Sequence, residues 1–165
     1  MKRTPALRAF YVIMAAFILL FSLTMCSDNK DRATLIVNGE TVKKADAYIH
    51  GEYPVIPLLA TFQACGYEVT WTSSDTAILT VDTLRYTVSL TNLSMIAEGQ
   101  TQNLLYVPDE AYEYTCKVSG KDILIYCYRL SANLSAYTNI QFEYEKDIKN
   151  SVIYVDIGVV AGINE

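Results

Sequence analysis

The sequence has 165 residues and a formal net charge of −5 at pH 7, and this length suits one domain of ordinary size. An acidic chain lacks the basic surface that nucleic-acid binding requires, so the composition argues against a nucleic-acid partner. Tyrosine is abundant, with 13 residues, and because tyrosine suits half-buried sheets, we expect a fold that is rich in strands.

The N-terminal segment has the features of an export signal. Residues 1–8 carry three basic side chains and no acid, and residues 9–25 are almost wholly apolar. A positive region followed by an apolar region is typical of a secretory signal, and the apolar run is also nearly long enough to span a bilayer. We therefore expect an extracytoplasmic protein in which residues 27–33 form a polar tether.

Residues 23–26, Leu-Thr-Met-Cys, resemble a lipobox, in which the Cys26 thiol is diacylated and becomes the new N-terminus. Leu23 fits that pattern, whereas Met25 stands where Gly, Ala or Ser is usual. Three interpretations stay open for residues 1–26: a lipoprotein signal with Cys26 as the lipidation site, which we favour, an uncleaved anchor helix, and an ordinary secretion signal. The first two make the membrane a partner through the N-terminus.

The stretch from residue 36 to residue 81 predicts a hairpin, a helix and another hairpin. Asn38-Gly39 lies between apolar runs and is a strong hairpin signal, because a type I′ turn needs positive φ at both positions. A further turn is expected at His50-Gly51. Pro57 suits the first turn of a helix, and Gly66 suits its left-handed C-terminal cap. Alternating apolar and polar residues after Gly66 indicate the closing hairpin.

Together these residues resemble the bacterial stalk domain, also called the copper amine oxidase N-terminal-like domain. The pattern consists of Val37-Asn38-Gly39, an aromatic-apolar-Pro-Leu helix start, Gly66 before Val69-x-Trp71, and a turn into a short apolar strand. The match covers about residues 34–129, and it departs from the family at Leu59, where an Arg is usual. The resemblance implies a non-catalytic module of exported bacterial proteins that spaces, docks or binds.

Residues 95–126 echo the earlier stretch in the placement of their turns and prolines. Glu98-Gly99 is placed like the first turn, Pro108 begins a second short helix, and residues 117–126 form a closing hairpin. Internal duplication is a feature of the stalk family. We therefore predict an α+β fold of mainly antiparallel β hairpins with one or two short helices, in a pseudo-repeated stalk-like domain over residues 34–130.

Residues 131–165 are predicted to form a C-terminal β-hairpin extension. It packs on the sheet of the domain, shields the edge of that sheet, or adds to the sheet of a partner, and we favour packing within the chain. The predicted hydrophobic core takes one apolar face from each element: Ile36, Val55, Leu58, Phe62, Val69, Trp71, Ile78, Val88, Val107, Ile123 and Ile125.

Three cysteines remain if Cys26 is acylated, namely Cys65, Cys116 and Cys127. We favour buried thiols. A Cys116–Cys127 disulfide is the alternative, although a tight hairpin around Gly120-Lys121 would set Cys116 opposite residue 125. A bridge from Cys65 to either of the others also stays open. No Cys-x-x-Cys occurs, so the spacing does not indicate zinc.

No catalytic motif is present, and we expect no catalytic residue, metal site or cofactor. His50 is the only histidine and is predicted to be solvated in its turn. An amine oxidase site needs several histidine ligands for copper and a cofactor tyrosine after Asn, and the sequence has neither. Glu143, Glu145 and Asp147 are predicted on a solvated strand face, with a calcium site as the weaker alternative.

The predicted function is that of a non-catalytic, membrane-tethered extracytoplasmic binding or scaffold module of the bacterial cell surface. Its expected partner is a cell-envelope protein or a polysaccharide. The alternative from another class is an exported thiol-redox protein or enzyme that uses Cys65, Cys116 or Cys127. A third hypothesis is a structural or inhibitory partner that binds through residues 131–165.

Overall fold

The computed structural model describes residues 31–106 and 116–160. Within these ranges the chain forms three sheets, mostly antiparallel, and two short helices. The predicted α+β class, with β hairpins and few helices, is therefore confirmed.

The middle sheet joins strands from both halves of the chain. Its order is β1 (Asp31–Arg32), β4 (Tyr48–His50), β5 (Tyr53–Pro57), β11 (Asp122–Tyr126) and β10 (Cys116–Ser119). The predicted turn after His50 joins β4 to β5, and Gly51 there has a φ of +61°. The predicted hairpin of β10 and β11 sets Cys116 opposite Ile125, in the register that the sequence indicates.

The pairing of β5 with β11 has a local twofold symmetry. Ile56 lies opposite Ile125, and the pairs Val55–Tyr126 and Pro57–Leu124 flank them on either side. Each of these strands leads directly into a helix, and each helix leads into a further hairpin. The first unit consists of β4, β5, α2 (Leu58–Ala64), β6 (Glu68–Trp71) and β7 (Thr76–Val81). The second consists of β10, β11, α4 (Cys127–Tyr137), β12 (Ile140–Asp147) and β13 (Val152–Val159).

The second unit starts later in the chain than the sequence predicts. The segment expected to open it forms β9 (Ser94–Ala97), which pairs with β8 (Leu84–Ser89) at the edge of a sheet ordered β6-β7-β8-β9. The helix expected after Pro108 lies outside the described residues. The helix of the second unit is α4, for which neither a proline nor a glycine marks the ends, although Cys127, Leu130 and Leu134 recur at helical spacing.

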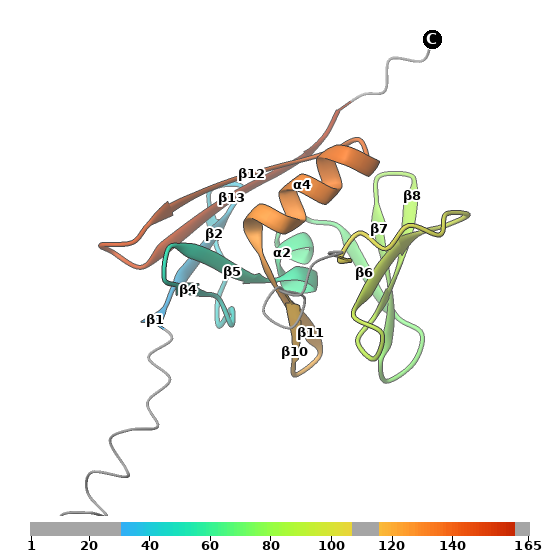
Figure 1. The fold of residues 1–165 in the computed structure, drawn as a ribbon, viewed down its shortest axis with the longest axis horizontal. Coiled ribbons are helices and arrows are strands. Elements are labelled where there is room, and N and C mark those ends of the chain that lie inside the picture. The colour runs from blue at the N-terminus through green and yellow to red at the C-terminus, as the bar shows by residue number, and fades with distance from the viewer. Residues whose placement is uncertain (1–30, 107–115, 161–165) are drawn as a thin grey trace, which may run out of the picture.

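The C-terminal hairpin belongs to the fold. β13 runs parallel to β2 (Thr34–Val37), and the third sheet has the order β12, β13, β2 and β3 (Glu40–Thr41). The Asn38-Gly39 turn between β2 and β3 has φ values of +47° and +82°, as the hairpin prediction requires. Packing of this hairpin within the chain is thus confirmed, and the expected boundary after residue 130 falls inside α4. Figure 1 shows the hairpin lying along α4.

Helix α2 takes its N-terminal cap from a residue far along the chain. Its first residue follows Pro57, as predicted, and Pro57 offers no side-chain cap. The Asp122 carboxylate accepts hydrogen bonds from the backbone N–H groups of Leu59 at 2.7 Å and Ala60 at 2.9 Å. These are two of the N–H groups that a helix start leaves without an intrahelical partner. The sequence separation is 63 residues, so α2 is completed only when β11 pairs with β5.

The C-terminus of α2 is a Schellman motif. Gly66 has a φ of +88°, its N–H bonds to the Gln63 carbonyl, and the N–H of Tyr67 reaches the Phe62 carbonyl. The rings of Phe62 and Tyr67 lie 6.0 Å apart, which supplies the apolar contact that accompanies this motif. The prediction that Gly66 ends the helix is confirmed.

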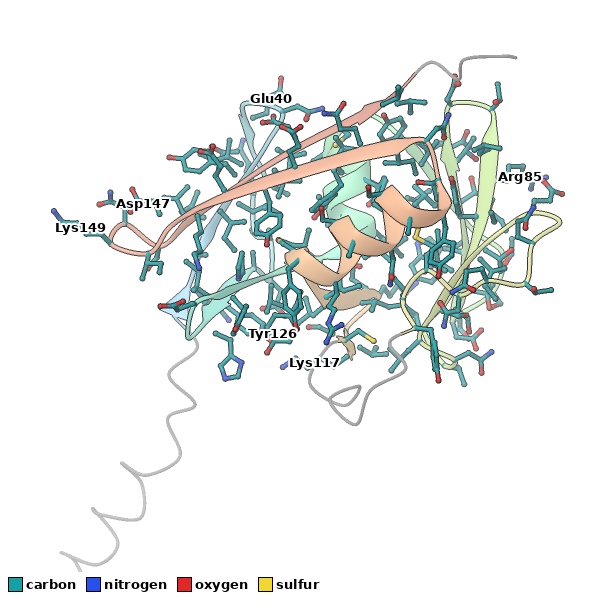
Figure 2. All side chains as sticks on the ribbon, turned by 45° about the horizontal axis from the view of Figure 1, so that its top comes forward. Glu40, Arg85, Lys117, Tyr126, Asp147 and Lys149 are labelled. Atoms are coloured by element: carbon teal, nitrogen blue, oxygen red, sulfur yellow. The ribbon has the colours of Figure 1, made fainter. Side chains whose placement is uncertain are left out.

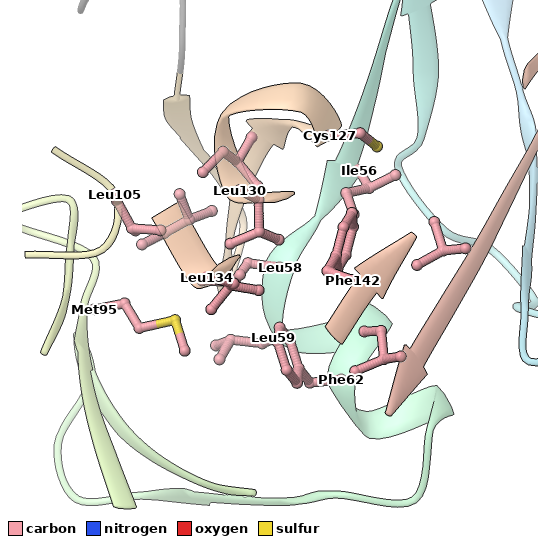
Figure 3. Close-up of a cluster of buried hydrophobic side chains, with 14 of the residues drawn as sticks. Ile56, Leu58, Leu59, Phe62, Met95, Leu105, Cys127, Leu130, Leu134 and Phe142 are labelled. Carbon is pink, nitrogen blue, oxygen red and sulfur yellow. The ribbon is translucent and has the colours of Figure 1, made fainter. Parts of the chain in front are cut away.

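The main core lies between the two helices and the sheets. Figure 3 shows Leu130 and Leu134 of α4 beside Leu58 of α2, with Phe142 of β12 approaching from the other side. The predicted core residues that are buried there are Leu58, Phe62, Val88, Ile123 and Ile125, while Val69 and Trp71 pack against the cluster partly buried and Val55 belongs to a smaller cluster.

Two core predictions have the wrong strand phase. In β2, Leu35 and Val37 are buried and Ile36 is only half-buried. In β7, the fully buried positions include Leu79, whereas Ile78 lies on the other face and is half-buried. A one-residue shift moves every side chain to the opposite face of a sheet, and both strands carry apolar residues at adjacent positions, so the sequence alone does not fix the phase. Val107 lies outside the described residues.

Candidate functional site

The residue predicted to carry a lipid, Cys26, lies outside the described residues. Among those residues no helix has the length and hydrophobicity to cross a membrane. His50 is the last residue of β4, directly before the turn, and is exposed, and its Nδ1 is 2.6 Å from the Tyr126 hydroxyl. This contact holds the imidazole at the margin of a group of tyrosine rings.

The three cysteines of the described chain are thiols and form no disulfide with one another. Cys116 and Cys127 are buried and Cys65 is half-buried. Burial, with a smaller effect of Asp156, raises the pKa of Cys65 to about 11. Burial also raises the pKa of Cys127 far above its ordinary value. The thiolate is the nucleophile in thiol chemistry. The raised pKa values keep Cys65 and Cys127 protonated at neutral pH, so both positions disfavour a thiol-redox function.

The acidic residues of β12 do not gather around a common point. Glu143 and Glu145 are exposed, whereas Asp147 accepts hydrogen bonds from the Asn150 side chain and backbone in the β12–β13 turn. Those bonds lower the pKa of Asp147 below its ordinary value. The described residues include no group of three or more His, Cys, Asp or Glu that could hold a metal ion.

Two adjoining hollows on the surface form the candidate site, which we call the tyrosine trough. The first has a volume of about 460 Å³ and the second about 500 Å³. They meet at Tyr144 and Glu145, which line both. The first is lined by Glu52, Tyr53, Pro54, Tyr128, Tyr144, Glu145 and Lys146, and the second by Ser131, Phe142, Glu143, Tyr144, Glu145, Tyr154 and Asp156.

Two residues that line the first hollow, Tyr53 and Tyr128, belong to a group of packed aromatic rings. The Tyr53 ring lies 5.3 Å from that of Tyr128 and 6.1 Å from that of Tyr126, and the last two are 5.7 Å apart. Tyr53 is 54% exposed although it is packed on one side. Such rings offer an apolar surface with a polar tip and little side-chain entropy to lose on binding, which is why tyrosine is enriched at interfaces.

Three carboxylates border the second hollow, and the described part of the chain gives them no cationic partner. Glu143 lies directly opposite Asp156 across the β12–β13 pair, and Glu145 lies opposite Tyr154. Like charges at opposed positions destabilise a sheet. In the described chain the ion pair within 4.0 Å is Arg85 with Glu98, in a different sheet, so none of these three carboxylates is neutralised by a lysine or arginine there.

Tyr144 lines both hollows and places a hydroxyl group where they meet. Burial, with smaller effects of Cys127 and Tyr128, raises the pKa of its hydroxyl above the ordinary value of 10.0. The hydroxyl therefore stays protonated at neutral pH and is a hydrogen-bond donor. The trough thus combines aromatic surface, a neutral hydrogen-bond donor and carboxylates that no described lysine or arginine neutralises.

Sequence reasoning does not identify the trough. Tyr53, Tyr128, Tyr144 and Tyr154 come from β5, α4, β12 and β13, and tyrosines are spread over most predicted strands. The one usable signal is the alternation of β12, which places Tyr144 on the same face as Ile140 and Phe142. Nothing local indicates that the start of α4 lies beside that face.

Comparisons with models of protein families, with curated proteins and with solved structures gave no match to this chain.

Proposed function

We propose that this protein is a non-catalytic binding module of the bacterial cell surface, held outside the cytoplasm by its N-terminus. The observation that carries the proposal is the tyrosine trough, an open surface on which rings from four elements meet carboxylates that form no ion pair with any residue the structure describes. The resemblance to the stalk domain, whose members space, dock or bind, agrees with this role.

The start of the described fold suits a tethered module. The predicted tether of residues 27–33 extends too far, because Asp31 and Arg32 form β1 and pair with β4. The described fold thus begins five positions after Cys26, the proposed site of lipidation. Because a short polar tether of that length allows limited reach, the domain would stay close to the membrane surface. The buried thiols with raised pKa values support this proposal over the thiol-redox alternative.

Tethering is tested by the intact mass of the protein from the membrane fraction of a bacterial host that processes lipoproteins. We expect the mass of the chain from Cys26 plus a diacylglycerol-sized addition, and we expect Cys26→Ala to lose that addition. Cys65→Ala is the matched control and should keep it. A full-length, unmodified chain in the membrane would replace lipidation by an anchor helix.

The thiol-redox alternative is tested by titration of the folded protein with a thiol reagent. We expect Cys65 to react slowly at neutral pH and faster as the pH approaches about 11, and Cys127 to react only on unfolding. A thiol that reacts at once at neutral pH and cycles with a disulfide substrate would favour the redox function instead.

A further inference from the structure

Strand β12 is an edge strand that borders both hollows of the trough. In the third sheet its neighbour is β13, and within the described chain no strand lies beyond it. The hollows follow it residue by residue, because Phe142, Glu143, Tyr144, Glu145 and Lys146 line one or both of them. An exposed edge presents backbone N–H and C=O groups to which another extended chain can pair.

The hydrogen bonds of β13 show which groups of β12 point outward. The Ile157 N–H donates to the Asn38 side chain, and the Val155 carbonyl accepts from the Asn38 N–H. Both groups of β13 are thus directed toward β2, so their partners in the register, Phe142 and Tyr144, point their own backbone groups away from β13.

The first half of this edge is already occupied by side chains at and after α4. The Ser131 hydroxyl donates to the Phe142 carbonyl at 3.0 Å, and the Ile140 N–H donates to the Thr138 hydroxyl at 3.0 Å. Alternation then leaves the backbone groups of Tyr144 and Lys146 directed outward at the trough. The Lys146 ammonium itself is turned to the Glu52 carbonyl, across the first hollow.

The two sides of this open edge differ in chemistry. On one side lie the rings of Tyr53, Tyr128 and Tyr144, and on the other lie the carboxylates of Glu143, Glu145 and Asp156. Successive side chains of an added strand would point alternately to the two sides. The aromatic side suits apolar side chains, and the acidic side suits lysine or arginine.

We propose that the Tyr144–Lys146 edge of β12 binds an extended segment of a partner protein in which basic and apolar residues alternate. The inference rests on the proposed binding function and names its ligand. Main-chain pairing supplies affinity in this mode, and the alternate side chains supply specificity. A basic side chain on the acidic side would lie beside Glu143 and Asp156, which face each other across the β12–β13 pair.

The test is the binding of the full chain in detergent to a short peptide of alternating lysine and valine, capped at both ends. Matched peptides carry glutamate in place of lysine, or the same residues in blocks. We expect saturable binding of the alternating peptide and about tenfold or weaker binding of both controls, because the charge and the spacing are each required. Equal binding of all three peptides overturns the proposal.

Backbone pairing is tested by N-methylation of alternate residues of the peptide. Only one phase of an added strand directs its N–H groups toward β12, so methylation of that phase should weaken binding about tenfold and methylation of the other phase should have little effect. Loss on the valine phase indicates an antiparallel strand and loss on the lysine phase a parallel one. Equal effects of both phases contradict strand addition.

Charge reversal on the protein locates the site. The double variant Glu143→Lys and Glu145→Lys should lose at least about tenfold in affinity, with a weaker dependence on salt. Glu40→Lys makes the same kind of change on β3, at the opposite edge of the same sheet, and should have no effect. Figure 2 shows Glu40 away from the β12–β13 turn that Asp147 and Lys149 mark.

Binding of a neutral glucan in the same assay distinguishes failure of the proposed ligand from failure of the proposed function. If the glucan binds, Tyr53→Ala abolishes its binding and the peptides do not bind, the module is a binding protein and the proposed ligand is wrong. If this protein binds the alternating peptide but is neither exported nor attached to a membrane in its host, the ligand inference stands and the tethered function is wrong.

Discussion

The two helices begin in equivalent places and are capped in different ways. Both follow strands related by the local twofold symmetry of the β5–β11 pair, and Pro57 before α2 has nearly the same backbone angles as Tyr126 before α4. At the start of α2, the Asp122 carboxylate accepts hydrogen bonds from the N–H groups of Leu59 and Ala60. The symmetry-related position is Tyr53, and α4 has no side-chain cap of its own from its N-cap residue.

This difference shows that the same architecture serves stability at the start of α2 and leaves side chains exposed at the start of α4. Asp122 is mostly buried and closes the start of α2 against the middle sheet. Tyr53 is more than half exposed and turns its ring to Tyr128 in the trough. One copy of the unit is thus completed by a carboxyl group inside the fold, and the other leaves aromatic surface that a ligand can reach.

Replacement of the Asp122 carboxylate should have the largest effect on stability. Asp122→Ala leaves the N–H groups of Leu59 and Ala60 without acceptors in a largely buried place, so we expect a loss of about 3 kcal/mol in the free energy of unfolding. Urea denaturation measures it. Asp122→Asn, which keeps one acceptor, should lose less, and equal losses for both variants would contradict the capping role.

The C-termini of the helices break the symmetry again, and Gly66 tests this. Gly66→Ala places a residue with a Cβ at a backbone φ of +88°. Although the added Cβ meets nothing within 4 Å, we expect a loss of about 1 kcal/mol in the free energy of unfolding. Gly158→Ala is the control, since it has open space without positive φ. It should be neutral or slightly stabilising by the same denaturation assay.

An aspartate at Tyr53 would sharpen the comparison. Tyr53→Asp places a carboxylate at the position that the twofold symmetry relates to Asp122, where it can accept from the N–H groups of Tyr128 and Arg129. We expect it to be about 1 kcal/mol more stable than Tyr53→Ala, which loses the same ring without gaining a cap. If the two variants unfold at the same urea concentration, the symmetry does not extend to the helix start. Both should weaken binding of the alternating peptide.

The pH dependence of stability should distinguish Asp122 from an exposed carboxylate. Burial, which outweighs three backbone hydrogen bonds, raises the pKa of Asp122 above its ordinary value of 3.8. Its contribution to stability is therefore complete below pH 3.8 and is lost as the pH rises through the raised pKa. Hydrogen bonds from Ser73 and Thr91 lower the pKa of Asp75, so its contribution is present above pH 3.8 and is lost on acidification.

The measurement is the difference in unfolding free energy between the wild type and each Asn variant across the acidic range. For Asp122→Asn the difference should fall as the pH rises above 3.8, and for Asp75→Asn it should rise. The same sign for both variants would show that hydrogen bonding, rather than burial, governs Asp122.

Local signals predicted a good part of this fold. Asn38-Gly39, Pro57 and Gly66 each have a conformational preference that does not depend on distant contacts, and all three lie where the sequence indicates. The phases of β2 and β7 were wrong because apolar residues occupy both faces there, and burial decides between them only after the sheets pack. Helix α4 was not predicted, because no proline or glycine at its ends supports the helical spacing of Cys127, Leu130 and Leu134.

The sequence by itself determined the class of the fold, the turns and the first helix, because these follow from φ preferences and from the spacing of apolar residues over a few positions. Only the tertiary structure decided that Asp122 caps α2, that β13 runs beside β2 and that β12 is left at an edge bordered by tyrosines. Each of these depends on backbone groups that meet across many residues of chain, where no residue's own preference specifies its partner.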